Sequence, residues 1–93
     1  MDIQLDKPRR IEWTMRALRT FKERTGKSLL TDGLVKAEEE ELFELTYAGL
    51  KGGDKHLDLT DEDLEDYFTL SIGMEVLADF SDNATGNVEP VKK

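Results

Sequence analysis

Three stretches of this sequence contain residue types that perform chemistry in other proteins, and the tripeptide Gly26-Lys27-Ser28 is the most suggestive. It matches the end of a phosphate-binding P-loop, in which backbone amides and a lysine hold the phosphates of a nucleotide. A P-loop also needs a glycine where this chain has Phe21, a strand before the loop and a helix after it. Here the helical pattern precedes the tripeptide. We therefore interpret Gly26 as the end of a helix and predict no nucleotide or other cofactor.

The acidic stretch from Asp58 to Asp66 and the single histidine, His56, are the other two candidates. A calcium-binding EF-hand loop needs acids at alternating positions, a central glycine and a final glutamate, and neither Asp54 nor Asp58 begins such a loop. A lone histidine supplies neither a metal site nor a catalytic triad, because both need partner residues. Without a nucleophile–base pair, the sequence predicts no catalytic residue, no metal site and no enzymatic activity.

The elements that would position these residues are amphipathic helices. Residues 13–26 have helical periodicity, with Thr14 as the expected N-cap and Gly26 as the expected terminal glycine. Residues 37–53 predict a second helix that begins with an acidic run and stops at two glycines, while Gly49 inside it indicates close approach of another helix. Thr60 is the expected N-cap of a third helix, and Gly73 is expected to break it ahead of a short fourth helix.

These elements predict a mainly α fold: a compact bundle of three to four short helices in a single domain over residues 1–80. Residues 1–12 are expected to form an extended arm, for which a short strand is the alternative. Residues 81–93 are polar and predict a flexible tail. The chain has no cysteine, no apolar run long enough to span a membrane and no signal-peptide core at its start, so we expect no membrane contact and no export.

The net charge of −8 is unevenly distributed. Residues 1–30 carry eight Lys/Arg and four Asp/Glu, a net of +4, whereas residues 31–93 carry five and seventeen, a net of −12. Such acidity repels nucleic acid, so we expect the basic residues near the start to contact an acidic protein surface. These charged candidates are Arg9, Arg10, Arg16 and Arg19. The uneven charge favours either head-to-tail self-association or charge balance within one chain.

The apolar residues of the first two helices exceed what a small bundle readily hides, so we predict one exposed apolar groove for protein binding. Some of the candidates must belong to the core, and the pattern alone does not separate the two groups. The candidates are Trp13, Leu18, Phe21, Leu42, Phe43, Leu45 and Leu50.

The succession "RIEWTMRALRTFKERTGKSLL", "LFELTYAGLKGGD" and "LTDEDLEDYF" resembles the small tail assembly chaperones of long-tailed bacteriophages, especially those of phages and prophages of Gram-positive bacteria. The resemblance spans residues 9–72. It implies a non-enzymatic helper that is made in the cytoplasm of the host bacterium, binds the tape measure protein and is absent from the mature virion. Tail tube protein is a further partner that the resemblance implies.

A second hypothesis from another class also follows from the charge pattern. A small acidic regulatory protein would occupy the basic groove of a DNA-binding protein, and the carboxylates of residues 38–41 and 61–66 would take the place of phosphates. Carboxylates arranged along one continuous face would favour this alternative.

Overall fold

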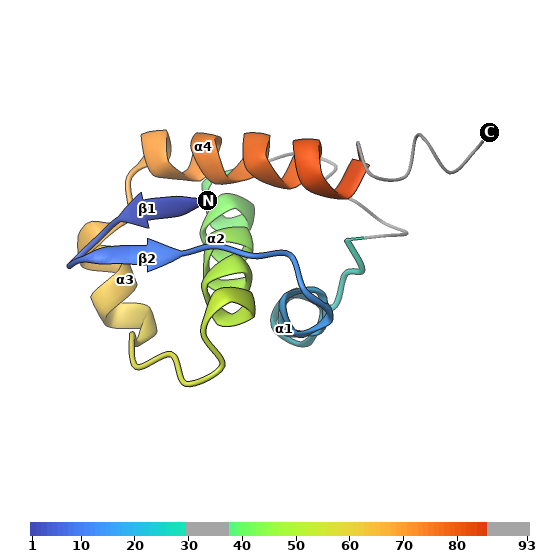
Figure 1. Cartoon of the computed structure of the whole chain (residues 1–93), viewed down its shortest axis with the longest axis horizontal. Coiled ribbons are helices and arrows are strands. Elements are labelled where there is room, and N and C mark those ends of the chain that lie inside the picture. Colours follow the sequence, from blue (N-terminus) through green and yellow to red (C-terminus); the bar gives the residue numbers. More distant parts are fainter. Residues whose placement is uncertain (30–37, 86–93) are drawn as a thin grey trace.

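The computed structural model describes residues 1–29 and 38–85, and within them the chain forms a compact helical bundle with an N-terminal β-hairpin (Figure 1). The elements follow in the order β1 (Asp2–Gln4), β2 (Pro8–Arg10), α1 (Met15–Thr25), α2 (Glu39–Gly53), α3 (Asp61–Tyr67), α4 (Leu70–Phe80) and a π-helical turn, η1 (Ser81–Thr85). The predicted mainly α fold is confirmed. The turn η1 continues α4 into the stretch predicted as a tail, and residues 86–93 of that stretch lie outside the described residues.

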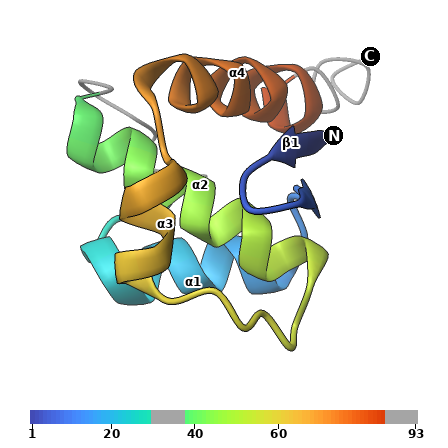
Figure 2. The same ribbon diagram turned by 90° about the vertical axis from the view of Figure 1, so that its left-hand side faces the viewer.

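The helix α2 is the centre of the molecule, because α1 packs against one side of it and α4 against the other (Figures 1 and 2). Its sequence suits this position, since apolar and small residues occupy much of its circumference. The buried residues of α2 are Leu42, Leu45, Thr46, Ala48, Gly49, Leu50 and Gly52. Phe21 from α1 and Val76 from α4 are fully buried as well, so the core extends from α1 through α2 to α4.

The helix α1 begins and ends where its sequence predicts. The hydroxyl of Thr14 accepts a hydrogen bond from the amide of Ala17, which caps the first turn. Gly26 adopts the left-handed conformation with φ of 80°, and its amide donates to the carbonyl of Lys22 at 2.7 Å. The glycine of the phosphate-like motif therefore ends a helix.

The N-terminal arm forms the alternative that the alternating sequence allowed, a short antiparallel hairpin. Ile3 lies opposite Arg9 in its register, and the amide of Ile11 donates to the carbonyl of Met1 at 2.7 Å. Ile3, Leu5 and Ile11 are buried. Their burial explains why this arm is ordered against the helices, since an isolated two-stranded hairpin is marginally stable in water.

Three glycines of α2 let the segment between β2 and α1 lie directly against the helix. A Cβ atom on Gly52 would lie 2.2 Å from the carbonyl oxygen of Glu12, and one on Gly53 would lie 2.4 Å from that of Arg10. At Gly49 the neighbours are the side chains of Ile11 and Trp13. The close approach predicted at Gly49 is therefore present, but the neighbour is this connecting segment instead of a helix. The helix α2 ends at Gly53, so the prediction that it stops at the two glycines is confirmed, and both glycines lie within its last turn.

The boundary between α3 and α4 lies earlier than predicted. Thr60 and Asp63 form the expected capping box at the start of α3. The chain leaves the helical conformation at Phe68, and Thr69 caps α4 by accepting a hydrogen bond from the amide of Ile72. Gly73 lies inside α4, where its lack of a side chain lets Phe68 and Leu42 approach closely. Gly73 therefore serves packing, and the prediction that it breaks a helix is wrong.

A buried arginine ties the hairpin to the segment before α3. Arg9 is 8% exposed, and its guanidinium donates to Asp6 at 2.8 Å and to Asp58 at 3.1 Å. The hydrogen bonds from Arg9 lower the pKa of Asp6 and the pKa of Asp58 below their ordinary values. The bond to Asp6 is the main cause that raises the pKa of Arg9, so this cation is charged at every accessible pH.

Replacing Gly52 with alanine is expected to cost far more stability than replacing Gly26. Gly52→Ala forces the backbone of the connecting segment to move, so we expect a loss of about 3 kcal/mol in the free energy of unfolding. Gly26→Ala meets no atom within 4 Å and costs only the left-handed backbone conformation, about 1 kcal/mol. Urea unfolding followed by the fluorescence of Trp13 measures both values. Equal losses in the two variants would contradict the close packing described for Gly52.

The Arg9 cluster is expected to make stability fall in acid. Because both carboxylates have lowered pKa values in the folded protein, their contribution is complete above the unfolded pKa of about 4 and is lost as the pH falls through the folded values. In Arg9→Met this contribution is absent, so its melting temperature should lie below that of the wild type at pH 7, and the difference should shrink below pH of about 4. The exposed neighbour Arg10→Met is the control, with a small change at pH 7. A difference that stays constant down to pH of about 2 would contradict the assignment.

Candidate protein-binding site

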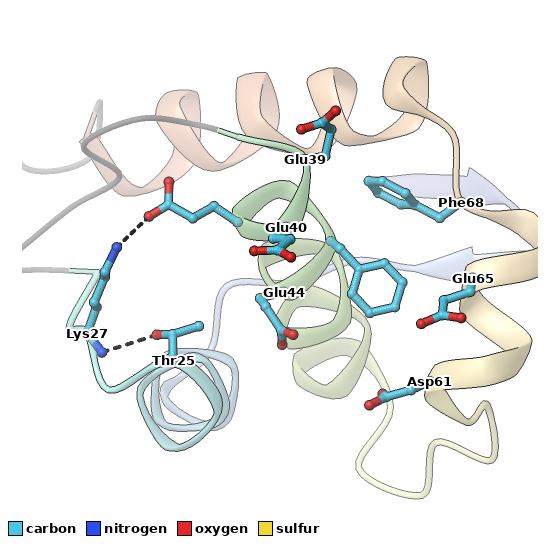
Figure 3. Close-up of a pocket in the computed structure, with 10 residues that line it drawn as sticks. Thr25, Lys27, Glu39, Glu40, Glu44, Asp61, Glu65 and Phe68 are labelled. Atoms are coloured by element: carbon cyan, nitrogen blue, oxygen red, sulfur yellow. Dashed lines mark hydrogen bonds and ion pairs between the residues drawn. The ribbon is translucent and has the colours of Figure 1, made fainter.

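A groove of about 580 Å³ lies between the C-terminal end of α1, the N-terminal half of α2, and α3 with the residue that follows it (Figure 3). Two aromatic side chains, Phe43 and Phe68, and Thr25 and Lys27 line it together with six carboxylates. The carboxylates belong to Glu39, Glu40, Glu41, Glu44, Asp61 and Glu65. We call this feature the acidic groove.

The preference of helix N-termini for negative charge explains why acidic residues occur on both sides of the acidic groove. The first turn of α2 contains Glu39, Glu40 and Glu41, and the first turn of α3 contains Asp61. The helix dipole stabilises negative charge at these N-terminal positions. Figure 3 shows carboxylates of α2 on one side of the groove and those of Asp61 and Glu65 on the other. The fold therefore joins two acidic segments that are distant in sequence.

The two aromatic rings form the apolar part of the acidic groove. The rings of Phe43 and Phe68 pack edge to face, with centroids 5.5 Å apart and planes inclined by 76°. Both side chains are partly buried and pack against the core. The groove therefore offers an aromatic surface surrounded by negative charge, a combination that suits a ligand with cationic and apolar groups.

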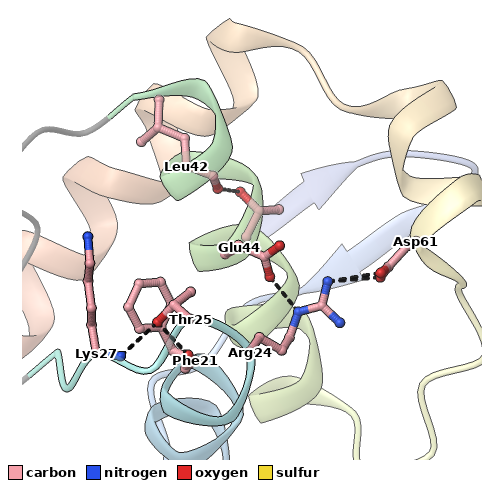
Figure 4. A network of polar contacts seen from close by, with 8 residues as sticks. Phe21, Arg24, Thr25, Lys27, Leu42, Glu44 and Asp61 are labelled. Carbon is pink, nitrogen blue, oxygen red and sulfur yellow. Dashed lines mark hydrogen bonds and ion pairs between the residues drawn. The ribbon is translucent and has the colours of Figure 1, made fainter.

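Arg24 neutralises part of the groove and joins three helices (Figure 4). Its guanidinium donates to Glu44 on α2 and to both carboxylate oxygens of Asp61 on α3, at 3.0 and 3.1 Å. It also lies 4.1 Å from the centre of the Tyr47 ring, a cation–π contact. Burial lowers the pKa of Arg24, but the hydrogen bonds to Glu44 and Asp61 outweigh it and raise this pKa overall.

The remaining charge of the acidic groove is negative. Lys27 pairs with Glu41 at 2.7 Å, and Arg24 forms ion pairs with Glu44 and Asp61. Glu39, Glu40 and Glu65 make no ion pair with any residue of the described part of the chain. Three carboxylates at the groove are thus left for a cationic partner.

A second surface feature is apolar and lies on α4. Leu70 and Met74 are 57% and 53% exposed, and they are neighbours at i and i+4 on the same side of the helix. Leu77, three residues further, is partly buried beside them. We call these three residues the α4 stripe. Tyr67, at the end of α3, adds an aromatic side chain that is 43% exposed.

The seven apolar residues predicted to line an exposed groove fall into two groups, four that are fully buried and three that are partly buried. Phe21, Leu42, Leu45 and Leu50 are at most 1% exposed, so their assignment to a binding surface is wrong. The reason is that α1 and α4 pack against α2 from both sides, so these four side chains lie in the core between the helices.

The other three predicted apolar residues are partly buried. Leu18 and Trp13 pack against the core. The indole of Trp13 donates to Asp79 at 2.9 Å and contacts the ring of Phe80 edge to face. Phe43 is the only one of the predicted apolar residues that lines the acidic groove.

The predicted basic residues do not form one patch. Arg9 is buried in its ion pairs with two aspartates, so its assignment to a surface contact is wrong. Arg10 is exposed and pairs with Glu12 at 2.5 Å. Arg16 and Arg19 are exposed on α1, where the Nε of Arg16 donates to the carbonyl of Lys51. Of the four, only Arg16 and Arg19 share a helix.

The structure also places His56 and tests the described residues for a metal site. His56 is exposed in the loop after α2, and its backbone amide donates to the carboxylate of Asp54 at 3.0 Å. Within residues 1–29 and 38–85, no group of three or more histidine or carboxylate side chains is arranged to hold a metal ion. None of the helices in those ranges is both long and apolar enough to cross a membrane.

The sequence does not reveal the α4 stripe when Gly73 is read as a helix breaker. With the break placed there, Leu70 and Met74 fall on different helices and their i, i+4 spacing has no meaning. The signal that locates the true boundary is Thr69, a good N-cap residue directly before an apolar-rich segment.

Comparison of the chain with models of protein families, with curated proteins and with solved structures finds no match.

Removing Arg24 is expected to loosen the three helices around the acidic groove. Arg24→Met keeps an unbranched stem near Tyr47 but leaves the half-buried carboxylate of Glu44 without its partner, so we expect a loss of about 2 kcal/mol in the free energy of unfolding. Arg19→Met, an exposed change on the same helix, should stay within about 0.5 kcal/mol of the wild type. Urea unfolding tests this pair, and a similar stability of the two variants would contradict the role of Arg24.

Proposed function

We propose that this protein is a non-catalytic tail assembly chaperone of a long-tailed bacteriophage or prophage, and that it binds the tape measure protein during tail assembly. The observation that carries the proposal is the α4 stripe, an apolar helix surface that remains exposed although the core is well packed. The resemblance over residues 9–72 supplies the class of client. Tail tube protein is proposed as a second partner, and the cytoplasm of the host bacterium as the place of action.

The chemistry of the α4 stripe fits a helical apolar client. A helix that lies on another protein uses apolar side chains at i, i+3, i+4 and i+7, and Leu70, Met74 and Leu77 follow this spacing. Methionine adapts to different partners because its side chain is unbranched and flexible. The chain has a net charge of −8, and this negative charge would keep a complex with an apolar client in solution.

Co-production with a tape measure protein from the same phage or prophage tests the proposal. We expect the soluble fraction of the tape measure protein to rise several-fold with the wild type, and to return to the level without chaperone for Leu70→Ser/Met74→Ser. The reason is that this variant removes apolar contact area from an exposed surface without disturbing the core.

The matched control is Ser71→Ala/Glu75→Ala, which changes the neighbouring exposed positions of the same helix at the same spacing. It should behave as the wild type. If the tape measure protein is equally insoluble with and without the wild-type chain, the proposed function fails. If both double variants keep full activity, the α4 stripe is not the client surface.

The meeting of two acidic runs at one groove favours the alternative function, an acidic regulator of a DNA-binding protein. Capture of host proteins on the immobilised chain distinguishes the two functions. Enrichment of DNA-binding proteins that is competed by duplex DNA and lost in Glu39→Lys/Glu40→Lys would favour the regulator. Retention of tape measure protein by that same variant would favour the chaperone.

A further inference from the structure

The outward side of α1 carries a charge opposite to that of the acidic groove. Ala17 and Phe21 are the buried residues of α1, so the residues on the opposite side of the helix point away from α2. Four exposed residues occupy that side: Met15, Arg19, Lys22 and Glu23. They carry two cations against one carboxylate, and we call them the basic face.

The basic face also contains an exposed apolar side chain. Met15 is 65% exposed, the largest value among the large apolar residues in the described part of the chain. Met15, Arg19 and Lys22 follow one another at i, i+4 and i+7, so they lie on one side of α1. The basic face therefore presents a thioether and two cations together.

The acidic groove presents the complementary groups. Glu39, Glu40 and Glu65 provide carboxylates without an ion pair in the described ranges, and the rings of Phe43 and Phe68 provide an aromatic surface. Methionine sulfur binds favourably beside aromatic rings, and arginine and lysine form charge-assisted hydrogen bonds with carboxylates. Each kind of group on one surface thus has a counterpart on the other.

The two surfaces of one copy cannot meet each other. The acidic groove is formed where the C-terminal end of α1 approaches α2 and α3, whereas the basic face is on the side of α1 turned away from α2 (Figures 1 and 3). Complementary surfaces that lie on different sides of one chain make a head-to-tail contact, which leaves one surface of each kind open at the ends.

We propose that the acidic groove of one copy binds the basic face of α1 of a second copy, so that the chain assembles head to tail into open chains or rings. Met15 of one copy lies against the aromatic surface of the next, and Arg19 and Lys22 pair with its free carboxylates. The contact is largely electrostatic, so its strength falls as salt shortens the range of charge interactions. This inference does not rest on the proposed function.

Light scattering after size exclusion tests the assembly. In about 20 mM salt we expect a mass at least twice that of the 10.6 kDa chain, and in about 500 mM salt the mass of one chain. A wild-type protein that has the mass of one chain at both salt concentrations and at millimolar concentration overturns the proposal.

Charge reversal identifies the two surfaces. Arg19→Glu/Lys22→Glu makes the basic face acidic, and Glu39→Lys/Glu40→Lys removes the negative excess of the groove. Each variant alone should have the mass of one chain in low salt. Their equimolar mixture should associate again, because the altered face of the first fits the altered groove of the second and the unaltered surfaces also fit each other.

The control is Glu62→Lys/Asp66→Lys, which makes the same change in net charge on α3 at exposed positions that do not line the groove. It should associate as the wild type does. Circular dichroism verifies that each variant is folded, and if Glu39→Lys/Glu40→Lys is not, Glu39→Gln/Glu40→Gln should still weaken association at least several-fold. Persistent association of both single-surface variants, or a folded mixture that stays monomeric, overturns the proposal.

Discussion

The packing of the connecting segment against the glycines of α2 is the contact on which the rest of the structure depends. The carbonyl groups of Arg10 and Glu12 occupy space that a side chain on Gly53 or Gly52 would fill. The amide of Glu12 also donates to the carbonyl of Gly49 at 3.1 Å. Each glycine in a helix lowers helix stability by about 1 kcal/mol relative to alanine, so the close contact must return more than it costs. It does so by placing Ile11 in the core and by setting the start of α1 beside the end of α2.

This contact also determines where α4 lies. Trp13 belongs to the connecting segment, rests against Gly49 and reaches α4, where its indole donates to Asp79 and contacts Phe80. Gly73 repeats the same principle at the other end of α4, because its missing side chain leaves room for Leu42 and Phe68. Glycines at positions 49 and 73 thus let α1, α2 and α4 pack closely, and this close packing lets a short chain bury a continuous core.

Local signals in the sequence were sufficient for the helices but not for their packing. Thr14, Gly26 and Thr60 mark helix ends through their own side chains or backbone, so their roles follow from neighbouring residues alone. Gly73 has the local signal of a helix breaker, but tertiary contacts override it and place this glycine inside α4. The split of Leu45 and Phe43 into core and groove depends on which faces α1, α3 and α4 cover, and no residue near them in sequence carries that information. The acidic groove needs the same knowledge, because its two acidic runs meet only in the folded chain.

The ion pairs change the meaning of the uneven charge. A net of +4 against −12 suggests that the two parts of the chain attract each other throughout. Two of the cations, Arg9 and Arg24, are partly or fully buried, and each pairs with two carboxylates. Once they and Lys27 are paired, cationic charge is left on the outward side of α1 and anionic charge at the groove. The α4 stripe is independent of both, because it is apolar. Salt weakens an electrostatic contact and leaves burial of apolar surface intact, so contacts through these two kinds of surface respond differently to ionic strength. The two proposals are therefore separable, because salt that weakens the proposed contact between copies leaves the proposed client surface unchanged.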